Sequence, residues 1–272
     1  MKKEGKFIMG THKAIYQPKG AAREYSAWAC NLYNGCSNQC DYCYCKRGVL
    51  SYTLGLSKPV LKKTVGKDDK EAFETFKKEL VMYKDNIIND GTGLFFSFST
   101  DPMLLEELPL TTLCVNECVK NDVPVQILTK KSYWVHTNID FMNYLFSNWY
   151  DKVKIGFTLT DHDELEPDAD STMSRMLECC YLIQNGVDTF ISLEPVVRFD
   201  DTLKIIKTFI DYGCIPPEFR IGLMSGVDKK TYYNWDECVT FVKEVKKLAL
   251  DNDFTVKWKL SIFDYYHNGY KK

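Results

Sequence analysis

Short apolar runs alternate along the chain with amphipathic stretches of helical period. Six of these runs are candidate strands, and a seventh lies near the C-terminus; together they cover residues 25–32, 94–99, 125–129, 154–160, 188–194, 220–224 and 255–260. In the seventh run, apolar and polar residues alternate, which favours a half-buried edge strand. The aromatic and basic residues between 252 and 272 would equally suit stacking on bases and pairing with phosphates.

Between these runs, apolar residues recur at spacings of three and four, as one buried helix face requires. Asp170 or Ser171 is a plausible N-cap for the second of four such stripes, and Gly186 a stop for it, while the third stripe ends at Gly213. The four stripes are Phe73, Phe76, Leu80, Tyr83 and Ile87; Met173, Met176, Leu177, Cys180 and Ile183; Leu203, Ile206, Phe209 and Ile210; and Val239, Val242, Val245, Leu248 and Ala249.

The alternation of strand and helix, repeated about six times, predicts parallel α/β units. The repeat length is irregular, which excludes a solenoid. No low-complexity linker divides the chain, so we expect one domain over residues 1–272, with a core at about 25–225 and an added helix and strand in 230–272 that close it. Periodicity alone leaves a doubly wound sheet and an incomplete barrel both open.

Composition adds that the protein is an ordinary globular one: 45% of its 272 residues are hydrophobic, 26% are charged, and the net charge is −2. No apolar run approaches the ~20 residues that span a bilayer, and the N-terminal MKKEGKFIMGTHK has no apolar signal region. We therefore expect a cytoplasmic protein with no membrane partner. The near-zero charge argues against binding to nucleic acid by bulk electrostatics, but leaves a local basic groove open.

Eleven cysteines are the unusual feature of the composition. Their odd number, the chain length and the missing export signal fit a disulfide framework badly, so scattered cysteines are expected to be small buried hydrophobes. Cys36, Cys40 and Cys43 differ, because they form a C-x3-C-x2-C motif in a loop rich in Gly, Asn and Ser after the first candidate strand. Such spacing lets thiolates converge on one iron–sulfur cluster, and three ligands leave one iron free for another group.

A zinc knuckle is the main alternative for this motif. It requires a fourth ligand at matched spacing, and only Cys45 is near, because the histidines lie dispersed at positions 12, 136, 162 and 267. Separate burial of three unliganded thiols in so polar a loop is less plausible still.

The C-x3-C-x-aromatic-C pattern, with Tyr42 as the aromatic residue, resembles the signature of radical S-adenosylmethionine (SAM) enzymes. The longer string N-L-Y-N-G-C-S-N-Q-C-D-Y-C-Y, residues 31–44, is similar to the N-P-Y-x-G-C-x-H-x-C-x-Y-C-Y string of the spore photoproduct lyase-like branch. The resemblance continues in order over roughly residues 25–200.

Further matches follow candidate strands, where sites in α/β folds gather. Ser99–Thr100–Asp101 resembles the branch's Ser/Thr-Asp element, which implies that Asp101 pairs with the SAM ammonium; residues 128–132 resemble its T-K-S element, which implies that Lys130 meets the SAM carboxylate. Singly, each match suits a helix cap, a strand end or a solvated charge. The SAM-binding residues implied in this way are Tyr42, Ser99, Thr100, Asp101, Lys130, Thr158, Arg175 and Glu194.

The resemblance implies a partial (β/α)6 TIM-like barrel with flanking helices and a [4Fe–4S] cluster on Cys36, Cys40 and Cys43. It also implies that SAM is cleaved reductively to a 5′-deoxyadenosyl radical, with electrons from a donor such as flavodoxin or ferredoxin. Tyr44 matches a radical-relay tyrosine of the branch, and Cys45 is a candidate hydrogen donor. Phe98 stands where spore photoproduct lyase has its hydrogen-donating cysteine, which argues against that same activity.

Several functions remain open. A nucleic-acid base, a nucleotide or a small molecule is the expected substrate class. The alternatives are a radical SAM enzyme that modifies a peptide, and a non-catalytic iron–sulfur or zinc protein that acts as a sensor or interaction module. Ordered SAM-contact candidates at several strand ends argue against a sensor, because a sensor needs no such set.

Overall fold

A predominantly parallel sheet forms the centre of the computed structural model, which describes residues 14–49, 51–147 and 151–269. Its strand order is β1-β2-β5-β6-β7-β8-β9-β10, and every pair from β2 onward is parallel, while β1 runs antiparallel to β2. A small second sheet pairs β3 (Tyr33–Asn34) with β4 (Val60–Leu61). The strands of the main sheet are β1 (Ile15–Tyr16), β2 (Trp28–Cys30), β5 (Leu94–Phe96), β6 (Val125–Thr129), β7 (Val153–Thr158), β8 (Thr189–Val196), β9 (Glu218–Leu223) and β10 (Thr255–Trp258).

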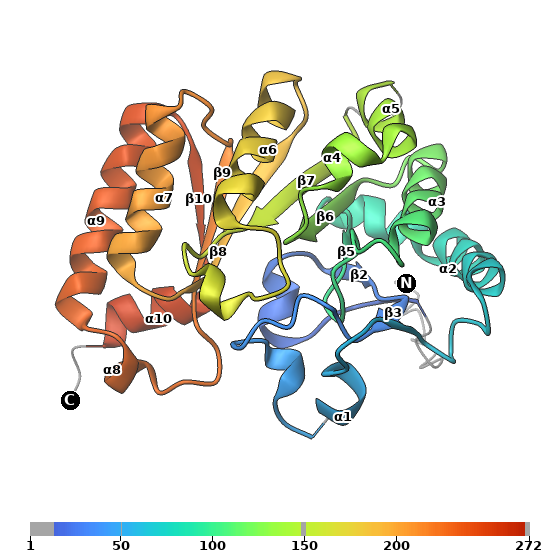
Figure 1. The fold of residues 1–272 in the computed structure, drawn as a ribbon, viewed down its shortest axis with the longest axis horizontal. Helices are drawn as coiled ribbons and strands as arrows, with labels where there is room; N and C mark the ends of the chain where they lie inside the picture. Colours follow the sequence, from blue (N-terminus) through green and yellow to red (C-terminus); the bar gives the residue numbers. More distant parts are fainter. Residues whose placement is uncertain (1–13, 50, 148–150, 270–272) are drawn as a thin grey trace, which may run out of the picture.

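Helices cover the outside of this sheet, and the segment around α1 (Ser51–Leu54) lies across one end of the strands (Figure 1). The longer helices are α2 (Asp69–Asp90), α3 (Leu108–Lys120), α5 (Ile139–Ser147), α6 (Thr172–Gln184), α7 (Phe199–Asp211), α9 (Trp235–Asn252) and α10 (Leu260–Asn268). The shorter ones are α4 (Trp134–Thr137), α8 (Lys229–Tyr232), and the 3-10 helices η1 (Gly20–Glu24), η2 (Tyr44–Lys46) and η3 (Asp163–Leu165). Strand and helix alternate, as parallel pairing requires.

The predicted fold class is confirmed, because this is the open, partial TIM-like barrel expected from the sequence. All seven predicted strands exist, and β6 has the predicted bounds. The seventh becomes β10, which extends the sheet beyond β9; among the described strands β10 has no pairing with β1, so the sheet stays open. The two-residue strands β1, β3 and β4 were not predicted, since two residues carry no periodicity.

The core has two layers. Between sheet and helices lies a large apolar cluster that includes Phe76 of α2, Trp134 of α4 and Phe209 of α7, all fully buried. Inside the barrel lies a smaller cluster around Phe95 and Phe190. Its floor is closed by Arg220, whose guanidinium lies 3.7 Å from the Phe190 ring centroid and donates a 2.6 Å hydrogen bond across the barrel to Gln126 Oε1. The volume above this floor is therefore bounded by strand ends.

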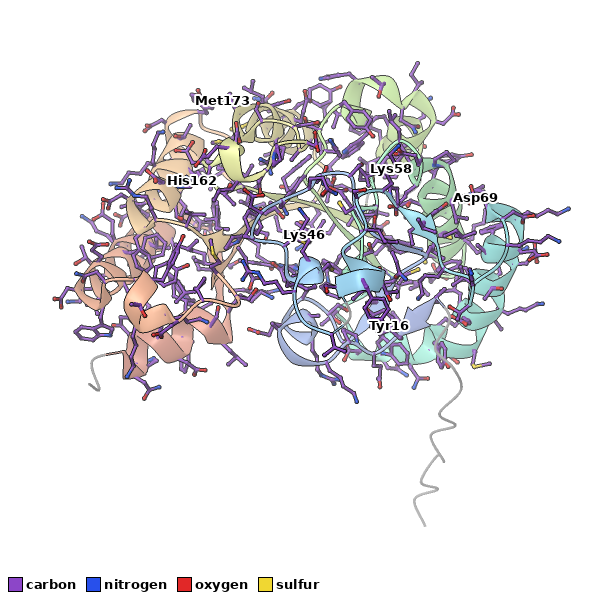
Figure 2. The ribbon with its side chains drawn as sticks, turned by 60° about the horizontal axis from the view of Figure 1, so that its bottom comes forward. Tyr16, Lys46, Lys58, Asp69, His162 and Met173 are labelled. Atoms are coloured by element: carbon purple, nitrogen blue, oxygen red, sulfur yellow. A yellow bond between two sulfur atoms is a disulfide. The ribbon has the colours of Figure 1, made fainter. Side chains whose placement is uncertain are left out.

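The buried face of helix α6 differs from the face predicted by the spacing of its apolar residues. Ser171 is its N-cap, with its Oγ accepting from Ser174 N at 3.2 Å. The predicted buried face is wrong at Met173 and Leu177, which are 48% and 51% exposed; Met173 lies at the outer edge of the molecule in Figure 2. The buried face is rotated relative to the predicted one because it includes Arg175. Hydrophobic periodicity does not assign a charged residue to a core.

One cysteine pair also departs from the prediction. Cys180 of α6 and Cys214, which follows α7, form a disulfide with a Cα–Cα distance of 5.2 Å, so for these two the expected role as separate buried thiols is wrong. The pairing brings together two cysteines 34 residues apart, and sequence spacing gives no sign of it. The other scattered cysteines are buried free thiols, as predicted: Cys30, Cys114, Cys118, Cys179 and Cys238.

Within the described ranges, no helix combines the length and the apolar character needed to cross a bilayer. The N-terminal stretch 1–13, where no signal region was expected, and the end of the aromatic tail at 270–272 lie outside the described residues.

Candidate functional site

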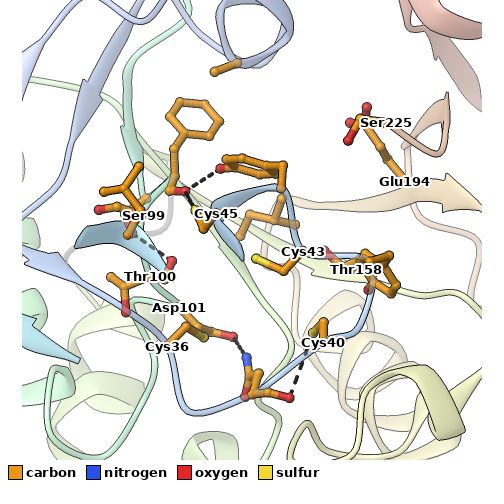
Figure 3. Close-up of a pocket in the computed structure, with 18 of the residues that line it drawn as sticks. Cys36, Cys40, Cys43, Cys45, Ser99, Thr100, Asp101, Thr158, Glu194 and Ser225 are labelled. Carbon is orange, nitrogen blue, oxygen red and sulfur yellow. Dashed lines mark hydrogen bonds between the residues drawn. The ribbon is translucent and has the colours of Figure 1, made fainter. Parts of the chain in front are cut away.

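A cavity of about 480 Å³ opens at the carboxyl ends of the parallel strands, where α/β folds place their active sites. Its walls bring together the cysteine motif and residues at the carboxyl ends of β5, β6, β7 and β8, which are far apart in sequence (Figure 3). Almost all of the residues predicted for the site line it: Cys36, Cys40, Tyr42, Cys43, Tyr44, Cys45, Ser99, Thr100, Asp101, Lys130, Thr158 and Glu194. The exception is Arg175, which lies outside the cavity wall.

The cysteine loop, residues 35–45, leaves β3 through a sharp turn at Gly35. This residue has φ +88°, and a Cβ there would lie 2.4 Å from the Lys58 carbonyl oxygen, so only glycine fits. Cys36 N then donates to Leu56 O at 3.0 Å. These contacts fix the direction in which the loop leaves β3.

The three thiols of the motif share the cavity wall without converging on one point. Among the residues the structure describes, no three His, Cys, Asp or Glu side chains are grouped closely enough to hold a single metal ion. A cluster makes a different demand, because each thiolate binds its own iron. The donor set of three cysteines in a cavity wall therefore fits an iron–sulfur cluster better than a zinc ion.

Burial controls the protonation of these thiols. It raises the pKa of Cys36 to about 12 and raises that of Cys40, where the nearby charge of Lys130 acts in the opposite direction. Cys43 differs, since a hydrogen bond from Cys45 lowers its pKa to about 6. Metal ligands must be thiolates, so a bound cation would be needed to hold the first two in that form.

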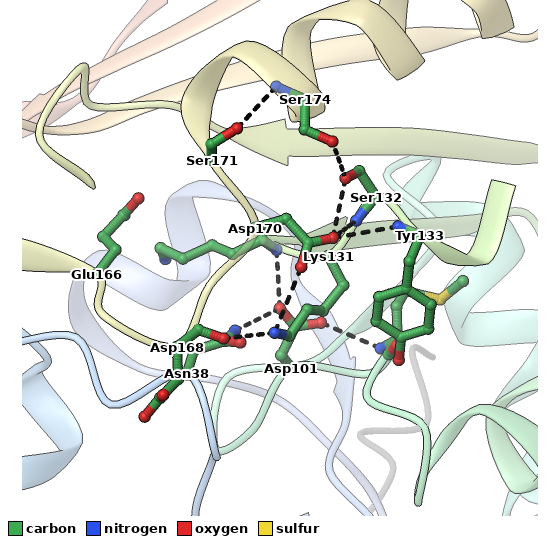
Figure 4. A network of polar contacts seen from close by, with 12 residues as sticks. Asn38, Asp101, Lys131, Ser132, Tyr133, Glu166, Asp168, Asp170, Ser171 and Ser174 are labelled. Atoms are coloured by element: carbon green, nitrogen blue, oxygen red, sulfur yellow. Dashed lines mark hydrogen bonds and ion pairs between the residues drawn. The ribbon is translucent and has the colours of Figure 1, made fainter. Parts of the chain in front are cut away.

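Asp101 has no free acceptor. Its Oδ1 accepts from Met103 N at 3.1 Å and Thr129 Oγ1 at 2.6 Å, and its Oδ2 accepts from Asn38 Nδ2 at 2.8 Å and Lys130 N at 2.7 Å (Figure 4). The carboxylate is buried, and these four bonds fill its lone pairs.

A second buried carboxylate, Glu166, contacts the other half of the cysteine loop. It accepts hydrogen bonds from Tyr42 Oη on one oxygen and from Arg175 Nη2 on the other. Arg175 is fully buried and also donates to Thr158 O at 2.6 Å. Its guanidinium is thus occupied by protein groups, and the structure does not bring it to the predicted SAM contact.

The Lys130 side chain lies next to the cysteine loop and near Glu166. Its Nζ lies 5.5 Å from the centroid of the Tyr42 ring. Burial alone would lower the pKa of Lys130, but Cys40 and Glu166 outweigh it and raise the pKa. The side chain is therefore a firmly charged cation next to the cysteine loop, suited to an anionic group in the cavity.

The hydroxyl groups that were candidate SAM contacts are partly engaged in the protein. Ser99 Oγ donates to Tyr33 O at 2.5 Å, and Thr100 Oγ1 donates to the buried carboxylate of Glu107. Thr158 and Cys40 line the same cavity (Figure 3).

The opposite wall of the cavity centres on Glu194 of β8, with Tyr25 and Lys259 from the segments before β2 and after β10. Glu194 of β8 accepts from Tyr25 Oη at 2.7 Å, and Tyr25 Oη is also 2.7 Å from Ser192 Oγ. The Lys259 ammonium lies 3.2 Å from the Tyr25 ring centroid and 3.9 Å from Glu194 Oε2, and no hydrogen-bond acceptor reaches it among the described residues. A Cβ on Gly222 would lie 2.7 Å from Glu194 Oε1, so glycine makes room for this cluster.

Burial shifts the ionisation of that cluster. It lowers the pKa of Lys259, which is 3% exposed, to about 8, and it raises the pKa of Glu194. The sequence predicts a role for Glu194 but none for Tyr25, Lys259 or Asn38. Asn38 alone carried a signal, because it replaces the histidine of the branch's string.

The two candidate catalytic residues, Tyr44 and Cys45, both contact the backbone carbonyl oxygen of Phe98. Tyr44 Oη donates to Phe98 O, and Cys45 Sγ lies 3.6 Å from the same oxygen. The Phe98 ring stacks on Phe95 with centroids 4.4 Å apart, and Tyr25 packs against both rings. Tyr44 and Cys45 therefore contact the backbone of a residue whose ring belongs to this aromatic cluster.

Comparison with known proteins finds relatives only at the level of structure, because no family model and no curated protein sequence matches the chain. A double mutant of spore photoproduct lyase with bound AdoMet and dinucleoside spore photoproduct matches 85% of this chain and 76% of its own, at 13% identity and a TM-score of 0.58. SuiB of Streptococcus suis bound to the precursor peptide SuiA matches 88% of this chain and 50% of its own, at 12% identity and a TM-score of 0.58.

A further SuiB structure, bound to S-adenosylmethionine, matches 68% of this chain at 11% identity and a TM-score of 0.50. This chain spans half or less of the length of the SuiB chains, 50% and 41% in these two cases. Two of these neighbours are described with bound S-adenosylmethionine or AdoMet, and the fold that they share with this chain is the one expected from the resemblance. At these identities the likeness concerns the fold.

Proposed function

We propose that the protein is a radical SAM enzyme, with a [4Fe–4S] cluster on Cys36, Cys40 and Cys43 and SAM bound beside it. The observation that carries the proposal is that the cysteine motif and the SAM-contact candidates of four other segments line one cavity of about 480 Å³. When bound, the cluster and SAM supply a hydrogen-abstracting 5′-deoxyadenosyl radical. The fold shared with spore photoproduct lyase and SuiB supports the same conclusion.

The chain's own residues would position these groups. Lys130, a cation in the wall beside Cys40, is suited to the SAM carboxylate. Thr158 is suited to a ribose hydroxyl, and the Tyr42 ring covers the side of the loop next to Lys130. Ser99 and Thr100 shape the wall through their contacts with Tyr33 and Glu107.

We infer that the substrate is a nucleobase or nucleotide rather than a peptide. An aromatic surface of Phe95, Phe98 and Tyr25 next to the Glu194 carboxylate offers stacking and an acceptor for a base N–H group. Cys45 Sγ lies 3.6 Å from the backbone oxygen of Phe98, a residue of this surface, and Tyr44 Oη donates to the same oxygen. Both are therefore candidates to return a hydrogen atom to the substrate radical.

The proposal is tested anaerobically. The protein is reconstituted with iron and sulfide, then given SAM and dithionite, and 5′-deoxyadenosine is assayed with and without nucleosides and dinucleotides. Formation by the native protein but not by Cys40→Ala supports the proposal, and deuterium transfer from a labelled substrate identifies the hydrogen that is taken. A cluster-loaded protein that neither binds nor cleaves SAM would instead indicate an iron–sulfur sensor.

The reaction needs a one-electron donor, and a flavodoxin or ferredoxin of the cytoplasm would meet that need. Replacing dithionite with either carrier and its reductase, and measuring the same nucleoside, tests this part of the proposal separately.

A further inference from the structure

We infer that Asp101 and Glu166 are positioning residues that hold the cysteine loop on both sides of Cys40, and that Asp101 is not a ligand of SAM. The identity of the group that the loop binds rests on the proposed function. The contacts that hold the loop do not, since they are contacts within the protein.

The first contact fixes the loop between Cys36 and Cys40. Asp101 follows β5, and its carboxylate joins Asn38 of the loop to Thr129 and Lys130 at the end of β6. An ammonium group would need a lone pair that Asp101 does not have to spare, because Met103 N takes the fourth. Asp101 therefore joins two strand ends to the loop.

Asn38 is oriented by this contact. An ionised carboxylate only accepts hydrogen bonds, so the amide nitrogen must face Asp101 and Oδ1 must face away. That oxygen is buried and has no hydrogen-bond partner, which is a cost that natural proteins rarely leave unmet. The contact to Asp101 thus determines the orientation, and Oδ1 is left as an acceptor for a donor that a bound group or water would bring.

The second contact fixes the loop between Cys40 and Cys43. Glu166 lies after η3 and binds the Tyr42 hydroxyl, while Arg175 holds the other carboxylate oxygen. Backbone bonds support the same junction, with Asp41 N donating to Leu165 O at 2.9 Å. A buried ion pair with further hydrogen bonds fixes side-chain direction more strictly than an exposed one does.

Cys40 therefore lies between two fixed neighbours, Asn38 and Tyr42, each two residues away. Its thiol position is set by the protein before any cluster is bound. The Cys40 side chain is buried, so we expect slow labelling in the iron-free protein and faster labelling when the loop opens.

The test follows the access of a reagent to Cys40 in the iron-free, full-length protein; Asn38 and Tyr42 variants keep both carboxylates, so they separate loop opening from the effect of the Glu166 charge on the Cys40 thiol. Iodoacetamide labelling of Cys40 is followed by mass spectrometry over time, in the native protein and in the Asp101→Asn and Glu166→Gln variants. We expect labelling at least about tenfold faster in both variants, because each replacement puts an N–H group where a donor already points. Glu107→Gln is the matched control, since this buried carboxylate binds Thr100 and makes no hydrogen bond to the loop; its rate should equal that of the native protein.

Conservative variants separate positioning from general loss of structure. Asn38→His keeps an N–H donor for Asp101 and should label at the native rate, whereas Asn38→Leu should label as fast as Asp101→Asn. Tyr42→Phe removes only one hydroxyl group, so it remains informative if a charged variant fails to fold.

A second readout distinguishes this inference from the proposed function. SAM binding to cluster-loaded protein is measured by equilibrium dialysis. If Asp101→Asn labels at the native rate and loses only SAM affinity, Asp101 is a SAM ligand and the inference is overturned. If native protein binds no SAM but the labelling rates differ as expected, the proposed function fails and the positioning role stands.

Discussion

The cavity has two walls that are built by different means. The wall with Cys36, Cys40 and Cys43 is a loop of irregular backbone, held by the buried carboxylates of Asp101 and Glu166. The opposite wall, called the strand wall because Glu194 of β8 lies at its centre, also contains Tyr25 and Lys259 from segments next to β2 and β10, and Glu194 itself lies where the β8–β9 register shifts. A loop must be fixed by side chains that do nothing else, whereas strand residues remain free to face the cavity.

Removing a cysteine ligand should affect only the wall formed by the cysteine loop, and it should give the largest change in iron content and activity. Cys43→Ala is expected to hold roughly tenfold less iron after reconstitution and to form no 5′-deoxyadenosine above background. Cys45→Ala is the matched control and should keep its iron. Glu194→Gln, on the opposite wall, should also keep its iron and lose only the response to substrate. Equal loss of iron in all three variants would show that the walls are not independent.

Breaking the buried ion pair between Arg175 and Glu166 should destabilise the whole protein, because Glu166 holds the wall formed by the cysteine loop. Arg175→Met leaves Glu166 buried without its hydrogen-bonded cation, and we expect a loss of about 3–5 kcal/mol in the free energy of unfolding. Lys204→Met breaks an exposed ion pair with Asp161, and should cost below about 1 kcal/mol. Urea unfolding followed by circular dichroism measures both, and similar losses in the two variants would contradict the assignment.

The strand wall should show its own dependence on pH. Lys259 has a pKa of about 8 in the folded protein, below its ordinary value, so protons bind more tightly to the unfolded chain. Stability should therefore rise with pH, from about 8 up to the unfolded pKa near 10.4, by at most about 3 kcal/mol. Lys259→Met should be more stable than the native protein at pH 7 and lack this rise. Parallel pH curves for the two proteins would count against a buried, destabilised ammonium.

The smallest expected effect is that of one hydroxyl group. Tyr25→Phe loses the hydrogen bonds to Glu194 and Ser192 while its ring stays in place, and we expect a cost of about 1–2 kcal/mol. Iron content should not change. A thermal melt and an iron assay suffice, and a drop in iron would link the strand wall to cluster retention.

The same contrast explains what the sequence predicts. The strands and the cavity-lining motif residues are predictable, because a strand such as β6 and a motif such as C-x3-C-x2-C are patterns of neighbouring residues. The roles of Asp101 and Arg175 are not, because they depend on partners such as Asn38 and Glu166 that only the fold brings near. Lys259 was missed for the same reason, as its position within an alternating strand pattern gives no sign of its contact with Tyr25.

Contacts between residues 24–25 and 259–260 have a consequence for the order of events during synthesis. Glu24 accepts a 2.7 Å hydrogen bond from Leu260 N, and Lys259 lies against Tyr25, so the strand wall is complete only when segments separated by more than two hundred residues have met. Residue 260 must leave the ribosome before this can happen, long after the cysteine loop has emerged. Cluster insertion into a closed cavity would thus be a post-translational event, and the nascent loop would need protection until then.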